Sequence, residues 1–125
     1  MSIANKEIIL KYHDLVFNKH CPREAAELYI GELYVQHNPM AKQGKDYFIH
    51  FFNDFFKENP EFSVKVVNSA AEGDLVFLHV HAKRGGWDAG EMVVDIYRLA
   101  DGKIQEHWDV IQKVDKYPIN PRAFF

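Results

Sequence analysis

The sequence predicts an α+β fold, in which N-terminal helices pack on an antiparallel sheet formed by the second half of the chain. In the first half apolar residues recur at helical spacing, whereas in the second half they alternate with polar residues as they do in strands. No linker, internal repeat or low-complexity segment separates the two halves. Because 125 residues is also an ordinary length for one domain, we expect a single domain over residues 1–125.

Three helices are expected in the first half. The first covers about residues 3–18, where apolar side chains lie three and four positions apart. The second begins at Pro22, because proline is favoured at the first helical position, and is expected to stop near Gly31. The third covers about residues 44–58, and one of its faces carries four rings, those of Phe48, Phe51, Phe52 and Phe55.

Four strands are expected in the second half, arranged as a meander. They begin at Phe62 and then cover about residues 75–83, 91–99 and 103–114. The dipeptide Asp101-Gly102 predicts a tight hairpin between the last two strands, because glycine tolerates the positive φ that such turns require. The segment 32–37, which precedes Asn38-Pro39, is left without an assigned structure.

The expected strands give the sheet one aliphatic and one mixed face. The mixed face is expected to carry His79, His81, Asp95, Tyr97, His107 and Asp109. The aliphatic face is expected to carry Val76, Leu78, Val80, Val94 and Ile96. Because the helices can cover only one face, we expect a second copy of the chain to cover the aliphatic one, which gives a homodimer through the sheet.

Composition excludes several classes of protein. The net charge is −3 and no run of basic residues occurs, so nucleic-acid binding is not expected. No stretch approaches the roughly 18 apolar residues of a membrane span, and the charged N-terminus does not resemble a signal peptide, so we expect a cytoplasmic protein. The single cysteine, Cys21, excludes an intrachain disulfide. The aromatic content of 14% instead favours a ring-lined cavity or an apolar interface.

Ionisable groups under a phenylalanine-rich helix would suit proton-transfer chemistry. Burial raises the pKa of a carboxyl group, which makes it a proton carrier near neutral pH. A neighbouring imidazole can share the proton or stabilise an enolate, and the apolar surroundings suit a small apolar organic ligand. The candidate catalytic residues are Asp109, His107, Asp95 and His37. The candidate ligand-binding residues are His79, His81, Tyr97, Phe48, Phe52 and Trp108.

Each candidate also has a structural interpretation. Asp95 can serve as a buried hydrogen-bond partner of a histidine, and His37 can cap the loop that precedes Pro39. His79 and His81, two residues apart on a strand, suit a metal ion, and three ligands from the histidines and aspartates above would make a site. We expect no metal and no other cofactor, because no cysteine accompanies the histidines and no helical His-x-x-x-His pair occurs.

Three segments resemble a known family. Residues 33–39 read Leu-Tyr-Val-Gln-His-Asn-Pro, residues 95–104 run from Asp-Ile-Tyr-Arg-Leu through Asp-Gly to Lys-Ile, and residues 106–112 read Glu-His-Trp-Asp-Val-Ile-Gln. Together they resemble the SnoaL-like branch of the nuclear transport factor 2-like superfamily. The resemblance implies a cone-shaped barrel, with helices on a curved antiparallel sheet of four to six strands around a pocket, and frequent homodimers.

The resemblance also implies a chemistry. Polyketide cyclases of this branch catalyse an intramolecular aldol condensation without a cofactor, using an aspartate that Asp109 matches by its place in the last strand. The position fourteen residues earlier, often a histidine in the cyclases, is Asp95 here. We therefore expect a small cofactor-independent enzyme of the cyclase, isomerase or lyase type that acts on a carbonyl-containing apolar molecule. The alternative is a non-catalytic ligand-binding or dimerisation module of the same fold.

Overall fold

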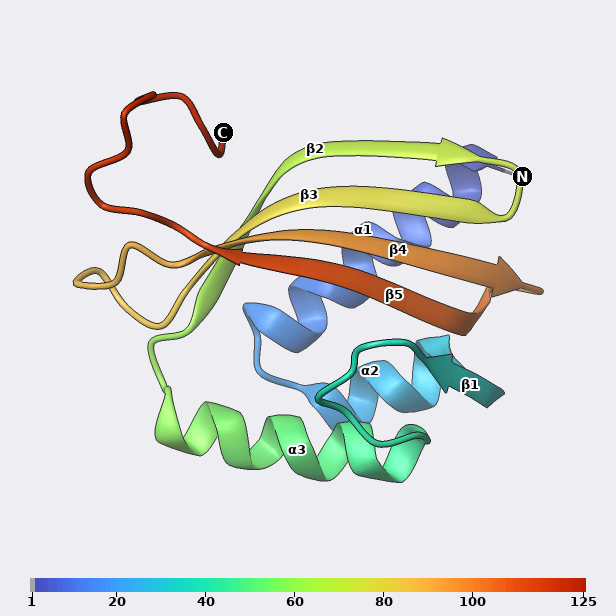
Figure 1. Ribbon diagram of the computed structural model, residues 1–125. Coiled ribbons are helices and arrows are strands. Elements are labelled where there is room, and N and C mark those ends of the chain that lie inside the picture. Colours follow the sequence, from blue (N-terminus) through green and yellow to red (C-terminus); the bar gives the residue numbers. More distant parts are fainter. Residues whose placement is uncertain (1) are drawn as a thin grey trace.

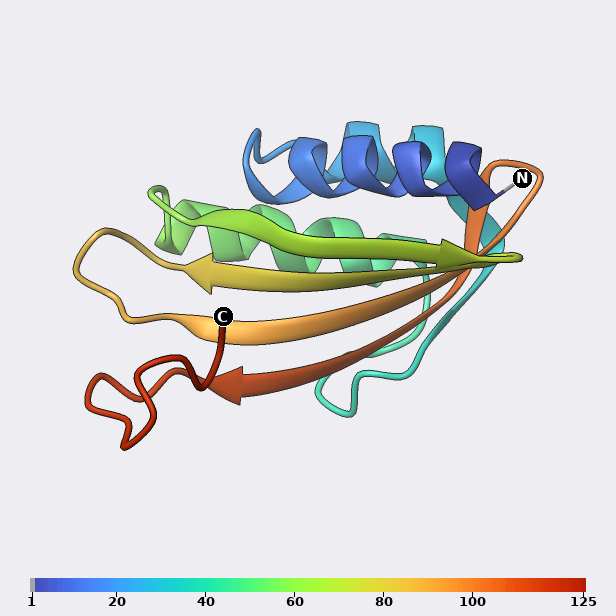
Figure 2. The same cartoon turned by 90° about the horizontal axis from the view of Figure 1, so that it is seen from above.

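Three helices lie along one side of a five-stranded curved sheet (Figures 1 and 2). The computed structural model describes residues 2–125. The helices are α1 (Ser2–Phe17), α2 (Pro22–Tyr29) and α3 (Lys45–Glu58). The strands are β1 (Ile30–Gln36), β2 (Ser63–Glu72), β3 (Leu75–Lys83), β4 (Glu91–Ala100) and β5 (Lys103–Lys113). None of the helices in the described part of the chain is long and apolar enough to cross a membrane. The expected α+β fold class is confirmed.

The strand order is β1-β5-β4-β3-β2, and β2 to β5 form the expected antiparallel meander. The fifth strand, β1, was not expected: it follows α2 directly and pairs in parallel with β5. Its final residue, Gln36, lies opposite His107. The chain between β1 and α3 therefore starts beside the middle of β5, and this position decides which of its side chains reach the sheet's inner face.

The hairpin between β4 and β5 has the expected two-residue turn. Asp101 and Gly102 both have positive φ, 52° and 74°, which matches the right-handed twist of the strands on either side. This turn sets the register of the two strands, and after one irregularity it places Tyr97 opposite His107 and Asp95 opposite Asp109.

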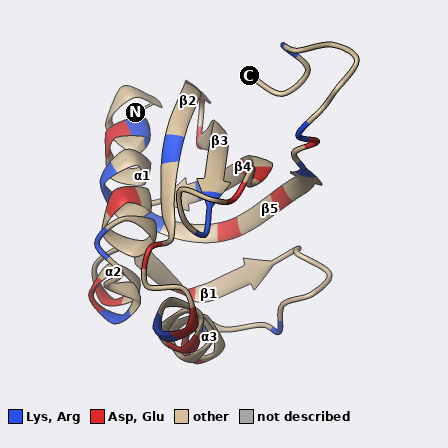
Figure 3. Cartoon of the chain, turned by 90° about the vertical axis from the view of Figure 1, so that its left-hand side faces the viewer, with Lys and Arg blue, Asp and Glu red and all other residues tan. Residues whose placement is uncertain are grey.

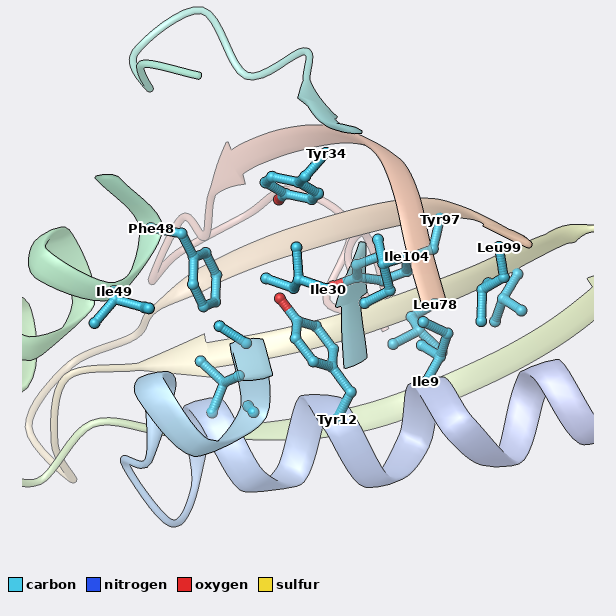
Figure 4. Close-up of a cluster of buried hydrophobic side chains, with 14 of the residues drawn as sticks. Ile9, Tyr12, Ile30, Tyr34, Phe48, Ile49, Leu78, Tyr97, Leu99 and Ile104 are labelled. Carbon is cyan, nitrogen blue, oxygen red and sulfur yellow. The ribbon is translucent and has the colours of Figure 1, made fainter. Parts of the chain in front are cut away.

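The helices cover the concave face of the sheet, and the core lies between them (Figures 2 and 3). Ile9, Tyr12 and Val16 form the buried stripe of α1 at helical spacing. They meet the inner side chains of the sheet, of which Leu78 and Ile104 are almost completely buried (Figure 4). Burial of these side chains, each worth about 1.5–3 kcal/mol, holds α1 against the sheet.

The expected faces of β3 were wrong. Val76, Leu78 and Val80 point inward and are at most 1% exposed, because they pack under the helices. Since successive side chains of a strand point to opposite faces, His79 and His81 lie on the outer face. The register pairs Leu78 with Asp95 and His79 with Val94, so the inner face combines aliphatic residues of β3 with ionisable residues of β4 and β5. Val94 and Ile96 remain on the outer face.

Candidate functional site

A cavity of about 440 Å³ lies between the helices and the inner face of the sheet. One wall is aromatic and comes mostly from α3. Its rings are those of Phe17, Phe48, Phe51, Phe52, Phe55 and Phe62. The opposite wall is the sheet, where Asp95, Tyr97, His107 and Asp109 contribute polar groups. A mostly apolar cavity with a few convergent polar groups is the usual setting for a small organic ligand.

Asp95 is a buried carboxylate held between two imidazoles. His107 Nε2 lies 2.8 Å from Asp95 Oδ1, and His13 Nε2 lies 3.2 Å from Asp95 Oδ2. Burial alone would raise the pKa of Asp95, but the hydrogen bonds and charges of His107 and His13 outweigh it and hold this pKa well below its ordinary value. Asp95 is therefore ionised at neutral pH, and both its oxygens are occupied.

Gln36, at the end of β1, orients His107 from the other side. Its Oε1 lies 2.7 Å from His107 Nδ1 and also accepts the backbone N–H of Asn38 at 3.1 Å. Its Nε2 donates to the hydroxyl oxygen of Tyr34 at 3.0 Å. One amide thus connects an imidazole, a hydroxyl and the backbone of the following loop.

Asp109 has a different environment from Asp95, although it lies opposite in the sheet. Asn38 Nδ2 donates to both of its oxygens, at 2.9 and 3.0 Å. The Asn38 amide is itself oriented, because its Oδ1 accepts the backbone N–H of Met40 at 2.7 Å. Asp109 is only partly buried and lines the cavity, and the two hydrogen bonds from Asn38 leave part of its accepting capacity free.

Three tyrosines surround the polar groups. Burial, and then the negative charges of Asp95 and Asp109, raise the pKa of Tyr34, so its hydroxyl keeps its proton. Burial likewise raises the pKa of Tyr12 and of Tyr97 well above the ordinary value. The rings of Tyr12 and Tyr34 enter the space between α1 and the sheet from opposite sides (Figure 4). The site therefore offers neutral hydroxyl donors beside two carboxylates.

The structure brings together six of the ten site residues expected from the sequence. Asp109, His107, Asp95, Tyr97, Phe48 and Phe52 all line the cavity. His37 and Trp108 do not line it: their rings stack at 4.7 Å, and His37 Nε2 pairs with Glu106 Oε2 at 2.7 Å. Gln36 and Asn38 use the inner side of the segment, so the side chain between them points away from the cavity.

His79 and His81 also lie away from the cavity. Their rings stack on Phe125, at 5.4 and 4.3 Å, so the C-terminal residues cover them on the outer face. The Nε2 atoms of His79 and His81 face the carbonyl oxygens of Phe124 and Ala89, each at 2.8 Å. This location follows from the inward burial of the alternate residues of β3.

Several residues of the site were missed by the sequence analysis. They are Tyr12, His13, Tyr34, Gln36 and Asn38. A signal for His13 was present, because it is a polar residue between Tyr12 and Val16 on the apolar stripe of the first helix. The alternation of residues 34, 36 and 38 would likewise have indicated an extended segment with one polar face.

Three of the described residues lie close enough together to bind a metal ion. Asp95, His107 and Asp109 each offer a ligand atom, and these atoms lie within 4.8 Å of one another. Both ring nitrogens of His107, however, are in hydrogen bonds, with Gln36 and with Asp95. A metal ligand must present an unprotonated ring nitrogen, so His107 would have to give up one of these bonds to bind an ion.

The family model described as the SnoaL-like domain matches residues 9–107. No curated protein matches the chain. Among solved structures, a protein proposed to be a polyketide cyclase from Bacillus cereus ATCC 10987 superposes with a TM-score of 0.73 at 18% identity, over 86% of this chain and 74% of that one. TsrD from Streptomyces laurentii gives 0.71 at 18%, over 89% and 90%.

A third structure, from Jannaschia sp. CCS1 and proposed to be a SnoaL-like polyketide cyclase, gives a TM-score of 0.69 at 23% identity, over 89% of this chain and 87% of that one. At such identities the likeness shows the fold alone, which is the nuclear transport factor 2-like α+β cone. The choice of reaction has to come from the site itself.

Proposed function

The chain belongs to the SnoaL-like domain family, and from this premise we propose that it is a cofactor-independent enzyme that moves a proton next to a carbonyl group. The ligand is a largely apolar small molecule, because the cavity wall is mostly aromatic. Asp109 is the base, and His107 is a nearby group that supports the charge formed on the oxygen.

The observation that carries this proposal is the difference between the two carboxylates. Asp95 is occupied on both oxygens by His107 and His13, and its lowered pKa makes it a poor proton acceptor. Asp109 lines the cavity and accepts hydrogen bonds from one amide, that of Asn38. Of the two, Asp109 therefore has the accepting capacity that a general base needs.

The proposed reaction requires only the transfer of a proton and the movement of an electron pair. The carboxylate of Asp109 takes a proton from the carbon beside the carbonyl, and the electron pair of the C–H bond moves to the carbonyl oxygen as an enolate. Where a carbon–carbon double bond is conjugated with the enolate, Asp109 then delivers the proton to the far carbon of that system, which moves the double bond and completes an isomerisation. Where the ligand carries a second carbonyl, the enolate carbon attacks it, and the resulting alkoxide takes the proton from Asp109, which gives the aldol and restores the carboxylate. Both outcomes need the same base and the same stabilisation of the oxygen.

Exchange of carbon-bound hydrogen tests the proposal without the natural substrate. 2-Tetralone, a bicyclic aromatic ketone, is incubated with the protein in D₂O, and deuterium uptake beside its carbonyl is followed by NMR. We expect the protein to accelerate uptake and the Asp109→Asn variant to lose roughly 10²–10⁴-fold of that acceleration. Asp115→Asn is the matched control, because the Asp115 carboxylate accepts the backbone N–H of Tyr117 and is not among the cavity residues.

Two results would contradict the proposal. Equal exchange by the wild type and Asp109→Asn would place the base elsewhere. Tight binding of 2-tetralone with no accelerated exchange would favour a non-catalytic binding module, the alternative expected from the sequence.

A homodimer through the outer face of the sheet is the second part of the proposal. That face carries Val94, Ile96, Trp108 and Val110, which are neighbours across β4 and β5. Val110 is 63% exposed. Apolar side chains in such a group are typical of an interface, and a second copy of the same face is the simplest cover for them.

A further inference from the structure

We propose that Tyr34 donates the hydrogen bond to the ligand's carbonyl oxygen, and that Gln36 is a positioning residue that connects this hydroxyl to a positively charged His107. The inference rests on the function proposed above and identifies the group that stabilises the enolate. It follows from the direction of three hydrogen bonds around the Gln36 amide and of a fourth between His107 and Asp95.

The first step fixes the orientation of the Gln36 amide. The backbone N–H of Asn38 can only donate, and it points at Gln36 at 3.1 Å, so the atom it meets must be the carbonyl oxygen Oε1. The same oxygen lies 2.7 Å from His107 Nδ1. Since an amide oxygen can only accept, His107 Nδ1 carries a proton.

The second step concerns the other nitrogen of the same ring. His107 Nε2 lies 2.8 Å from Asp95 Oδ1, and two lone pairs at this distance would repel, so a proton lies between the two atoms. Each oxygen of Asp95 faces a histidine nitrogen, His107 Nε2 at 2.8 Å and His13 Nε2 at 3.2 Å, which is the arrangement of an ionised carboxylate that accepts two hydrogen bonds. We therefore assign the proton to the imidazole and infer that His107 is an imidazolium buried beside an anion.

The third step gives the direction of the Tyr34 hydroxyl. With Oε1 assigned, the amide nitrogen of Gln36 is the atom 3.0 Å from the Tyr34 oxygen, and a nitrogen of this kind can only donate. The Tyr34 oxygen accepts this bond, so its own hydrogen remains available for another partner. Tyr34 lines the cavity and is 7% exposed, so a bound ligand is well placed to receive that hydrogen.

The chain of bonds also strengthens the donor. A hydrogen bond from the His107 cation polarises the Gln36 amide, and the amide in turn polarises the Tyr34 hydroxyl. The histidines themselves cannot replace Tyr34 in this role. Both nitrogens of His107 are occupied, and His13 uses Nε2 for Asp95 while its buried Nδ1 has no hydrogen-bond partner within residues 2–125.

Nitrogen NMR of the ligand-free protein tests the arrangement independently of any reaction. With ¹⁵N-labelled histidine at pH 7, we expect both ring nitrogens of His107 to show protonated shifts. Gln36→Met keeps the length of the side chain and removes its three hydrogen bonds, to Tyr34, to the Asn38 backbone and to His107. In this variant the Nδ1 resonance of His107 should move, and the exchange of its proton with water should accelerate. An unprotonated ring nitrogen in wild-type His107 would overturn the proposal.

Binding of 2-naphthol, compared with naphthalene, tests the donor itself. The hydroxyl of 2-naphthol mimics an enol oxygen, and naphthalene has the same rings without it. Tyr34→Phe should weaken 2-naphthol binding roughly twofold to tenfold, the range for a hydrogen bond between neutral groups, and leave naphthalene binding unchanged. Gln36→Met should give a smaller loss in the same direction.

Tyr29→Phe is the matched control, because Tyr29 packs on Tyr12 at 6.2 Å but is not among the cavity residues. An unchanged ratio of the two affinities in Tyr34→Phe would overturn the donor role. Different results would overturn the two proposals. Hydrogen exchange that continues unchanged in Asp109→Asn would show that Asp109 is not the base. An unprotonated ring nitrogen in wild-type His107 would show that the Tyr34–Gln36–His107 chain of hydrogen bonds is not arranged as proposed.

Discussion

Asp95 and Asp109 lie directly opposite each other on adjacent strands, yet they are held in contrasting ways. Two carboxylates facing each other across a sheet repel and destabilise it. Here the repulsion is offset because Asp95 has His107 and His13 as partners and Asp109 has the amide of Asn38. The two aspartates therefore have different positions in the site: Asp95 holds the imidazoles of His107 and His13, and Asp109 lines the cavity.

Removing the charge of Asp95 should destabilise the protein strongly. Asp95→Asn keeps the shape of the side chain but leaves the buried His107 without its anion, so the free energy of unfolding should fall by about 3–5 kcal/mol. Urea denaturation followed by circular dichroism measures the change. The control is Asp74→Asn, which removes the exposed Asp74–Arg98 pair and should cost about 0–1 kcal/mol. Equal losses in the two variants would contradict the buried ion pair.

The same carboxylate predicts an acid limit to stability. The pKa of Asp95 is lower in the folded protein than the ordinary value of about 3.9 in the unfolded chain, so the unfolded chain binds the proton more readily. Its contribution to stability is complete above about pH 4 and is lost as the pH falls through the lower folded pKa. Urea unfolding between pH 3 and 5, below the range in which histidines of the unfolded chain take up protons, should therefore show the gap between wild type and Asp95→Asn narrowing on the acid side. A gap that widens toward low pH would contradict the direction of the shift.

Zinc should leave the stability of the protein unchanged. Asp95, His107 and Asp109 are close enough to share an ion, but both nitrogens of His107 carry protons in the arrangement inferred above. One equivalent of Zn²⁺ at pH 7 is expected to produce no shift in Tm, and metal analysis of the purified protein should give much less than one ion per chain. A stoichiometric ion that Asp109→Asn abolishes would instead establish a metal centre.

The outer face of the sheet should hold two copies together. Sedimentation velocity at micromolar concentration is expected to show a dimer, and Val110→Glu should shift it toward the monomer, because a charge would be buried in the interface. Ile119→Glu, on the exposed C-terminal segment, serves as the control for added surface charge. A wild-type monomer under these conditions would remove the homodimer proposal.

The layers could be predicted from the sequence, but the two faces of β3 were predicted the wrong way round. Alternation put Asp95, His107 and Asp109 together on the mixed face of β4 and β5, and this face is the inner one. In β3 both sides are apolar enough to be buried, and histidine suits either a pocket or a surface, so polarity could not decide the face. The packing of Leu78 under α1 decides it, and that contact joins residues far apart in the chain.

The strand β1 and the loop after it were the other unpredicted part. The strand is short and lies at the sheet edge in parallel with β5, and a parallel partner leaves no hairpin signal in the sequence. Gln36 and Asn38 acquire their roles only through that pairing. The resemblance included this segment, but the catalytic role was assigned to His37 and not to its neighbours Gln36 and Asn38.

Because the aromatic wall comes mostly from α3, the residues that shape the cavity are separate from the residues proposed to carry out the reaction. The cavity residues of α3 include the rings of Phe51, Phe52 and Phe55, while the proposed base, Asp109, lies on β5 and the proposed oxygen-stabilising hydroxyl, that of Tyr34, lies on β1. Changing the size of these rings would alter which molecules fit while the base and the oxygen-stabilising groups keep their geometry. The helix is thus a natural target for libraries that seek new ligands, because variation there leaves the reactive groups in place.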